Sequence, residues 1–379
     1  MNYSFPRYLL AKQTVDDRAL NKDVLAALES SLPKKSLSVI EVGAGIGTML
    51  TRLLRWGILP DSVDYTLIDS SPENIAFAQT WLPQWAREHG CQVDQPSASS
   101  IRFSASQSAA PSAAPSAAIR FSASQSVAKS AAPSAAIRFS ASQSVAKSAA
   151  PSASSIRFSA SQSVAKSAAI RFSASQSVAK SVAKSVAKSV AKSAAPSVTI
   201  HLIHADLFDY IRSAPAPADL LIAHAFLDLL PLPDSLPGLL SLTKDLAWLT
   251  LNFDGVTTFE PALDPELDSA IEAAYHRTMD SRPGGGDSRS GRHLFGVLEQ
   301  AGVQIVSAGA SDWVVYPVEG QYPADEAYFL QFILHFFEES LGHLPELPAW
   351  LEKRRRQVER GELTYIAHQI DFLARVKPG

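Results

Sequence analysis

The stretch VIEVGAGIGTM at residues 39–49 decides the fold that the sequence predicts. It begins with β-branched and apolar residues, which are typical of a strand buried on both faces of a parallel sheet. Gly43, Gly45 and Gly47 follow at alternate positions, and residues 48–54 then carry apolar side chains at helical spacing. Glycine lets a ligand approach the backbone, and the first turn of a helix offers free N–H groups. The stretch therefore predicts a strand, a ligand-binding turn and a helix.

A second predicted strand, residues 63–69, ends in Asp69. A helix from Pro72 to Glu88 is expected to follow, because Ser71 is a good N-cap and proline suits the first turn. An acidic residue at the end of the second strand of such a fold can accept hydrogen bonds from both hydroxyls of a ribose. Capping of the following helix is the alternative role of Asp69.

Two later strands also end in polar residues. Residues 198–206 are a predicted third strand that ends in Asp206, and residues 218–228 are a predicted fourth strand that runs into a loop with His224 and Asp228. Ligands of open α/β sheets bind beyond the carboxyl ends of the strands. We therefore expect all three side chains to lie near the glycine turn.

Glu41 stands two residues before the first glycine, and the glycine spacing is G-x-G-x-G. Dinucleotide-binding proteins have G-x-G-x-x-G instead, which would place a glycine at Thr48. The observed arrangement, together with Asp69, resembles the first two motifs of class I S-adenosylmethionine-dependent methyltransferases. The resemblance implies an α/β fold with a Rossmann-like, seven-stranded, mostly parallel sheet whose last strand is antiparallel. It also implies S-adenosylmethionine (SAM) as the cofactor.

The resemblance assigns seven residues to the cofactor site: Glu41, Gly43, Gly45, Gly47, Asp69, Asp206 and Phe208. By analogy with the family, the glycine turn would hold the methionine part of SAM, Asp69 the ribose, and Asp206 the adenine amine. Two roles stay open for Phe208, which could pack against the adenine ring or in the core.

His224 and Asp228 lie where the family places residues near the transferred methyl group, and they are the catalytic candidates. His224 is the candidate general base because the reference pKa of histidine is close to neutral. Packing or hydrogen bonding beside the cofactor is the alternative role of His224.

Residues 254–292 are predicted to form a glycine-rich loop that closes over a substrate. Arg277, Arg282 and Arg292 are the candidate substrate-binding residues in it, because a guanidinium group suits a carboxylate or phosphate. The methyl acceptor is therefore expected to be a small molecule with an acidic group. A mobile surface loop with solvated charges is the alternative.

Helices are expected at both ends of the chain. Those before residue 39 would lie over the cofactor, with contacts from Tyr8, Lys12, Asp17 and Arg18 unless these side chains form a solvated face. Strands are expected at residues 246–253, 303–308 and 313–318, and helices at residues 293–301, 324–341 and 348–376. The last two helices are expected to form a cap or a dimer contact.

The sequence Ile-Arg-Phe-Ser-Ala-Ser-Gln-Ser occurs five times, starting at residues 101, 119, 137, 156 and 170. The spacers are rich in alanine, proline and serine, and each copy has few large apolar residues, so a solenoid is not favoured. Residues 97–198 are therefore expected to be a disordered, low-complexity insert. Removal of residues 97–197 is expected to leave cofactor affinity unchanged.

Charge is distributed unevenly along the chain. Residues 97–198 hold 12 basic residues and no acidic one, which leaves 22 basic and 37 acidic residues in the remainder. An acidic body disfavours nucleic acid as a partner. The single cysteine, Cys91, excludes an intrachain disulfide, and no signal peptide or long apolar run is present, so we expect a cytoplasmic protein without a membrane span.

The expected organisation has four parts: residues 1–96 with the N-terminal helices and the first half of the methyltransferase domain, the insert at 97–198, the second half at 199–318, and a C-terminal helical cap at 319–379. The predicted function is methyl transfer from SAM to a small-molecule acceptor, without a metal. A non-catalytic interaction protein with this fold and a nicotinamide-dependent oxidoreductase are the alternatives.

Overall fold

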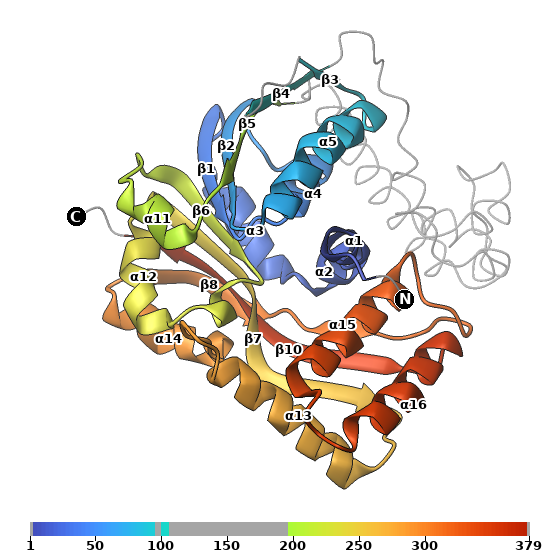
Figure 1. Cartoon of the computed structure of the whole chain (residues 1–379). Coiled ribbons are helices and arrows are strands. Elements are labelled where there is room, and N and C mark those ends of the chain that lie inside the picture. The colour runs from blue at the N-terminus through green and yellow to red at the C-terminus, as the bar shows by residue number, and fades with distance from the viewer. Residues whose placement is uncertain (1–2, 95–99, 106–195, 377–379) are drawn as a thin grey trace, which may run out of the picture. The chain divides into compact units, whose positions relative to one another are not determined.

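A computed structural model describes residues 3–94, 100–105 and 196–376 of the chain (Figure 1). The described elements are, in chain order, α1 (Phe5–Ala11), α2 (Gln13–Ala19), α3 (Lys22–Ser31), β1 (Ser36–Val42), α4 (Thr48–Trp56), β2 (Ser62–Asp69), α5 (Pro72–Glu88), β3 (Cys91–Val93), β4 (Ser100–Ala105), β5 (Ser197–His204), α11 (Leu207–Arg212), β6 (Ala218–His224), the short 3-10 helix η2 (Leu227–Leu229), α12 (Leu232–Leu240), β7 (Thr243–Glu260), α13 (Pro265–Asp280), α14 (Ser290–Gln300), β8 (Gln304–Ala310), β9 (Trp313–Val315), α15 (Glu326–Leu341), α16 (Leu347–Glu359) and β10 (Thr364–Arg375).

The described strands form one mixed sheet in the order β3-β4-β5-β2-β1-β6-β7-β10-β8, and β9 pairs with β10. Strands β5, β2, β1, β6 and β7 are parallel, whereas β10 is antiparallel to both β7 and β8. The seven strands from β5 to β8 in this order match the predicted sheet, so the predicted α/β fold is confirmed. Strand β1 lies where the chain order reverses, and this is the place where open α/β sheets bind ligands.

Both faces of the parallel strands are buried, which explains the apolar run that opens the glycine motif. In β1, Leu37 and Val39 join one hydrophobic cluster, and Ile40 and Val42 join the other. Helices α1 to α5, α13, α15 and α16 contribute to the first cluster, and α11, α12 and α14 to the second. The sheet is thus the middle layer between two helical layers.

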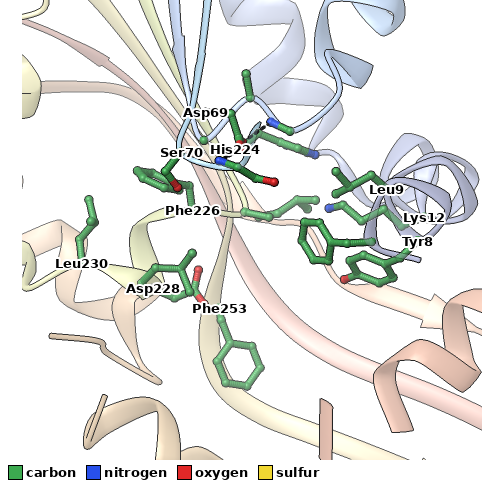
Figure 2. Close-up of a pocket in the computed structure, with 18 of the residues that line it drawn as sticks. Tyr8, Leu9, Lys12, Asp69, Ser70, His224, Phe226, Asp228, Leu230 and Phe253 are labelled. Carbon is green, nitrogen blue, oxygen red and sulfur yellow. Dashed lines mark hydrogen bonds between the residues drawn. The ribbon is translucent and has the colours of Figure 1, made fainter. Parts of the chain in front are cut away.

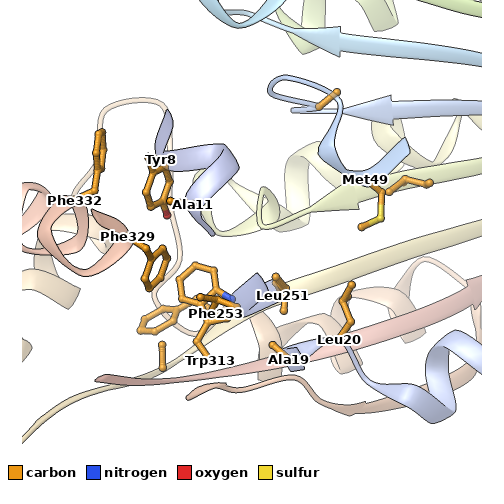
Figure 3. Packing of buried hydrophobic residues seen from close by; sticks show 14 of the residues in the cluster. Tyr8, Ala11, Ala19, Leu20, Met49, Leu251, Phe253, Trp313, Phe329 and Phe332 are labelled. Atoms are coloured by element: carbon orange, nitrogen blue, oxygen red, sulfur yellow. The ribbon is translucent and has the colours of Figure 1, made fainter. Parts of the chain in front are cut away.

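Aromatic packing holds α1 against α15. The ring of Tyr8 stacks on Phe332 at a centroid distance of 4.6 Å and on Phe329 at 5.8 Å (Figure 3). Trp313 of β9 meets Phe329 edge to face at 5.3 Å. These ring contacts hold the N-terminal helices in place over the carboxyl ends of the strands.

Strands β7 and β10 continue beyond the rest of the sheet as a long ribbon (Figure 1). β7 pairs with β6 only as far as Thr250, whereas its pairing with β10 continues to Glu260. β9 pairs with the same end of β10. The ribbon therefore provides a wall beyond the carboxyl edge of the parallel strands.

The prediction of a helix over residues 348–376 is wrong in its second half. Helix α16 ends at Glu359, and Gly361 follows with a left-handed φ of 62°. Residues 364–375 then form β10, the antiparallel strand of the sheet, so residues 313–318 do not have that role. β10 lies between β7 and β8, and alternate side chains over much of its length are buried against the sheet's helical layers. The segment predicted as a helical cap therefore supplies an interior strand of the sheet.

The prediction of a loop over residues 254–292 is also wrong for most of that range. Residues up to Glu260 extend β7, and α13 occupies Pro265–Asp280. The side chain of Asp264 caps α13 by accepting hydrogen bonds from the backbone N–H groups of Glu266 and Leu267. This cap, followed by proline at the first helical position, is a start signal that the sequence contains.

The first repeat copy is part of the fold. Residues 100–105 form β4, which pairs antiparallel with β5, and its Ile101 and Phe103 side chains are buried. The prediction of a disordered insert is therefore wrong for residues 100–105 and for the start of β5. For residues 106–195 that prediction lies outside the described residues.

We expect that residues 106–195 can be replaced by a two-residue Asn-Gly turn without loss of the fold. Phe103 of β4 lies opposite Val198 of β5, so the chain leaves one strand beside the start of the other, as in a hairpin. The melting temperature of the shortened chain should stay within a few degrees of the full chain. In contrast, Phe103→Ala in the shortened chain should cost about 3–5 kcal/mol of unfolding free energy, because this side chain is 1% exposed. Unfolding of the shortened chain at room temperature would contradict the hairpin arrangement.

Candidate functional site

A cavity of about 710 Å³ opens at the carboxyl ends of the parallel strands (Figure 2). On one side it is lined by the glycine turn after β1 and by the ends of β2 and β5. On the other side it is lined by α1, α13, α15, β9 and the ribbon of β7 and β10. Its volume is within the range of small-molecule and cofactor sites.

The glycine turn presents backbone to the cavity. Gly43 and Gly45 line it, with left-handed φ values of 60° and 57°, whereas Gly47 does not line it. A Cβ on Gly43 would lie 2.3 Å from the ring of Phe226, so a side chain is excluded there. Gly47 caps the N-terminus of α4 with a φ of 83°, a conformation that favours glycine.

Asp69 ties the glycine turn to the end of β2. Its Oδ2 accepts a hydrogen bond from the backbone N–H of Gly45 at 2.7 Å. Its Oδ1 accepts hydrogen bonds from the backbone N–H of Ser71 at 2.9 Å and from the amide of Asn74 at 3.0 Å. The carboxylate lines the cavity, and a carboxylate has about four acceptor positions. Three of these are occupied, so about one remains for a ligand hydroxyl.

Glu41 also lines the cavity, and it is 2% exposed. Its carboxyl group accepts a hydrogen bond from the hydroxyl of Tyr65 at 2.7 Å. Burial raises the pKa of Glu41 to about 8, against the opposing effects of Tyr65 and Arg52. At neutral pH Glu41 is therefore mainly protonated and can donate a hydrogen bond into the cavity.

Asp206 and Phe208 line the cavity at the end of β5. Oδ1 of Asp206 caps α11 by accepting hydrogen bonds from the backbone N–H groups of Phe208 and Asp209 at 2.8 and 3.2 Å. The exposed Asp206 side chain keeps Oδ2 available, since the described residues donate no hydrogen bond to that oxygen. Phe208 is half-buried and also packs against the second hydrophobic cluster.

His224 lines the cavity, but both of its ring nitrogens have protein partners. Nε2 lies 3.0 Å from Oδ2 of Asp16, and Nδ1 lies 2.8 Å from the hydroxyl of Thr250. Burial lowers the pKa of His224 to about 4, although the charge of Asp16 works in the opposite direction. His224 is therefore neutral at physiological pH, and it donates from Nε2 to Asp16 and accepts from Thr250 at Nδ1. This arrangement favours a positioning role over that of general base.

Asp16 is the centre of a buried charge network. It is fully buried, and its carboxylate lies 3.1 Å from Nζ of Lys12 and 3.4 Å from the guanidinium of Arg52. Oδ1 also accepts a hydrogen bond from the indole N–H of Trp313 at 3.0 Å. Burial opposes the ionisation of Asp16, yet Lys12, His224 and Arg52 together hold its pKa below the usual range. The network fixes α2 and β9 at the wall of the cavity.

We expect His224 to make the stability of the protein depend on pH between about 6.5 and 4. In this window the unfolded chain binds a proton at His224 and the folded chain does not, so stability falls as the pH falls. The loss approaches roughly 3 kcal/mol at pH 4. His224→Asn removes the titration, so the difference in unfolding free energy between wild type and variant should shrink by that amount from pH 7 to pH 4. Urea unfolding at several pH values measures it, and a constant difference would contradict the prediction.

Asp228 faces the cavity from η2, just after β6 (Figure 2). Burial raises its pKa to about 6, although the charge of Arg282 acts in the opposite direction. Among the described residues, no other side chain donates a hydrogen bond to this carboxylate or forms an ion pair with it. Of the two catalytic candidates, Asp228 is the one with free acceptor capacity.

The three predicted substrate-binding arginines are separated in the structure. Arg282 lines the cavity and is exposed, whereas Arg277 is exposed on α13 and does not line it. The guanidinium of Arg292 is paired with Asp254, at 2.7 Å from Nε to Oδ1 and 3.0 Å from Nη2 to Oδ2. Only Arg282 is therefore placed to meet a ligand in this cavity.

Two of the four N-terminal residues predicted to contact the cofactor line the cavity, and the other two form ion pairs elsewhere. Tyr8 and Lys12 line the cavity. Asp17 instead pairs with Arg52 and Arg55, and Arg18 pairs with Glu326 at 2.5 Å.

Several cavity residues were not singled out from the sequence: Asp16 beside the wall, and Phe253, Tyr275, Trp313, Tyr365 and Gln369 lining it. Tyr275 lies in the segment read as a loop, and Tyr365 and Gln369 in the segment read as a helix. The signals that could have placed them were the start of α13 at Asp264 and the glycine after α16 at Gly361.

The residues at the glycine side suit an adenosyl cofactor. The turn has no side chains that would block a ligand, Asp69 has a spare acceptor position for a ribose hydroxyl, and Asp206 has a free oxygen for an amine. In the described part of the chain, no group of three or more His, Cys, Asp or Glu side chains could hold a metal ion. None of the described helices combines the length and the apolar composition needed to span a membrane.

Comparison with known proteins gives matches in structure only. No family model and no curated protein sequence matches the chain. The structure is similar over nearly the full length of the chain to SAM-dependent methyltransferases. One, from Thiobacillus denitrificans and bound to S-adenosylhomocysteine (SAH), has a TM-score of 0.39 at 11% identity and 99% coverage of both chains. Another, from Geobacter sulfurreducens and also bound to SAH, has a TM-score of 0.36 at 11% identity and 98% coverage of both chains.

Proposed function

We propose that this protein transfers a methyl group from SAM to a small-molecule acceptor. The observation that carries the proposal is the hydrogen bond between Asp69 and the backbone of Gly45, at the edge of a cavity large enough for a cofactor and a second molecule. This hydrogen bond joins the glycine turn to the acidic residue at the end of β2, the two motifs on which the resemblance to class I methyltransferases rests. Glu41, Asp206 and Phe208 line the same part of the cavity and would hold the rest of the cofactor.

Bound SAM would supply an electrophilic methyl group on a sulfonium centre. The protein then has three tasks: to hold the cofactor, to align a nucleophile with the methyl group, and to exclude water. Alignment alone can lower a barrier by roughly 7–11 kcal/mol in well-oriented cases. The wall formed by α1, α13, α15 and the ribbon closes the far side of the cavity and would hold the acceptor.

The single cysteine fits a reducing compartment, and we propose a cytoplasmic location.

Calorimetric titration of the purified chain with SAM, SAH and NADH tests the proposal. We expect SAM and SAH to bind with micromolar affinity and NADH not to bind, because the turn lacks the third glycine of the dinucleotide motif. An untargeted search for metabolites that gain one methyl group on expression would then identify the acceptor. Absence of SAM and SAH binding at millimolar concentration would overturn the proposal, and binding of NADH alone would favour an oxidoreductase.

A further inference from the structure

The side of the cavity opposite the glycine turn carries a carboxylate without a protein counter-charge in contact. Asp228 has no ion pair within the described residues, and its side chain lines the cavity (Figure 2). Asp228 is half-buried, and carboxylates largely removed from water normally have hydrogen-bond or ion-pair partners. A partner for Asp228 is therefore expected to come from the ligand.

Three tyrosine side chains surround the same space. Tyr8, Tyr275 and Tyr365 all line the cavity, and Tyr8 and Tyr365 are only 6% and 4% exposed. Burial raises the pKa of both Tyr8 and Tyr275, and the charge of Asp228 adds to this effect. Within the described ranges, no protein group is hydrogen-bonded to any of these three hydroxyls. Buried phenols without protein partners provide ligand contacts of fixed direction.

The remaining wall is aromatic. Phe253, Trp313 and Phe336 line it, and the negative faces of such rings attract cations. Nζ of Lys12 already lies over the Trp313 ring, 5.2 Å from its centroid, which leaves Phe253 and Phe336 for a ligand. The positive groups of the cavity do not cancel this preference. Lys12 is already paired with Asp16 at 3.1 Å. The charge of Arg282 acts on Asp228, but the side chain is exposed and forms no ion pair with that carboxylate, so solvent screens it. The wall therefore combines a free carboxylate, phenol oxygens and aromatic faces, a combination that favours a cationic ligand over an anionic one.

We propose that the methyl acceptor is an amine, and that Asp228 binds it as an ammonium ion and takes the proton that it must lose. This inference rests on the proposed function. The ammonium ion gives one proton to the Asp228 carboxylate, which leaves a lone pair on nitrogen. That pair forms the new N–C bond while the C–S bond of SAM breaks, and its electrons stay on sulfur to give neutral SAH. The Tyr8, Tyr275 and Tyr365 hydroxyls orient the nitrogen, and the proton leaves Asp228 to solvent after the product departs.

The test measures binding of matched probes to the full chain, with and without SAH. The probes are a panel of aryl-alkyl and alkyl amines, each compared with the alcohol and the carboxylic acid of the same skeleton, for example phenethylamine, 2-phenylethanol and 3-phenylpropanoate. We expect the best amines to bind at least about tenfold tighter than their alcohols and acids, because a charge-assisted hydrogen bond is lost in the others. Labelled SAM should transfer its methyl group to these amines only.

The variant Asp228→Asn separates the possible roles of this side chain, with Asp234→Asn on the exposed start of α12 as the matched control. We expect the Asp228 variant to lose the amine preference by about tenfold or more while SAH affinity is kept, which also reports that it folds. Tyr365→Phe should weaken amine binding in the same direction if the hydroxyl orients the nitrogen.

The inference would be overturned by tighter binding of the acids or alcohols, by no amine binding at millimolar concentration, or by an amine preference that survives in Asp228→Asn. The Asp228→Asn variant could instead bind SAM more weakly while its binding of SAH and of amines is unchanged. That result would show that the Asp228 carboxylate contacts the sulfonium of SAM, and it would also overturn the inference. Failure of the proposed function gives a different result, namely no SAH binding by wild type, and the probe preference of the protein alone can still be measured.

Discussion

Replacing Asp69 with alanine is expected to weaken SAH binding by about a hundredfold or more. Hydrogen bonds to a charged group are each worth about 1.5–3 kcal/mol, and a ribose hydroxyl bound at the remaining acceptor position of Asp69 would lose its bond. The substitution also releases the backbone N–H of Gly45 and the amide of Asn74, so the turn loses the contact that holds it against β2. Both effects act in the same direction. Calorimetric titration with SAH measures the loss.

Two controls make this result interpretable. Asp234→Ala removes an exposed carboxylate from the first turn of α12, away from the cavity lining, and should leave SAH affinity unchanged. Circular dichroism of Asp69→Ala should show that the sheet and helices are retained. An affinity within threefold of wild type in a folded Asp69→Ala protein would show that the carboxylate does not hold the ligand.

Replacing Asp16 with alanine is expected to lower the unfolding free energy by about 3–5 kcal/mol, which is the usual cost of removing one partner from a buried ion pair. The substitution leaves Lys12 and Arg52 as buried cations without this partner, and it leaves the N–H groups of His224 and Trp313 without an acceptor. Because Lys12, His224 and Trp313 also line the cavity, ligand affinity should fall as well. Urea unfolding at pH 7 measures the change.

The matched control is Asp325→Ala. Asp325 also pairs with an arginine, Arg7, but the two side chains are 46% and 53% exposed. Exposed pairs contribute at most about 1 kcal/mol, so this variant should remain close to wild type. A similar loss of unfolding free energy in both variants would show that burial does not increase the contribution of the Asp16 network to stability.

The features that depend on local sequence could be predicted. The apolar run before Gly43, the spacing of the glycines and the acid at the end of β2 led to the parallel sheet and to the glycine side of the cavity. Helix α5 has the predicted limits because Ser71 and Pro72 mark its start. These signals lie within a few residues of the structure that they specify.

The acceptor side of the cavity could not be predicted in this way. Tyr8, Tyr275 and Tyr365 come from α1, α13 and β10. Tyr275 lies 267 residues after Tyr8 and 90 residues before Tyr365, so the three converge only through packing. Asp16 lies on a short helix, and nothing in its neighbours along the chain shows that this face is buried against β9 and Arg52. Likewise, the pairing of His224 with Asp16 changes its chemistry although the residue type suggests a base.

The glycine turn and Asp69 were determined by the sequence itself, because a left-handed backbone and a close approach leave glycine as the favoured residue, and these demands act locally. The position of β10 was decided only by the tertiary structure. The sequence of residues 364–375 taken alone is compatible with a helix. In the structure these residues lie between β7 and β8, and their backbone groups form hydrogen bonds with both strands. Burial of their alternate side chains and completion of those hydrogen bonds outweigh local helix propensity, and this places Tyr365 and Gln369 in the cavity wall.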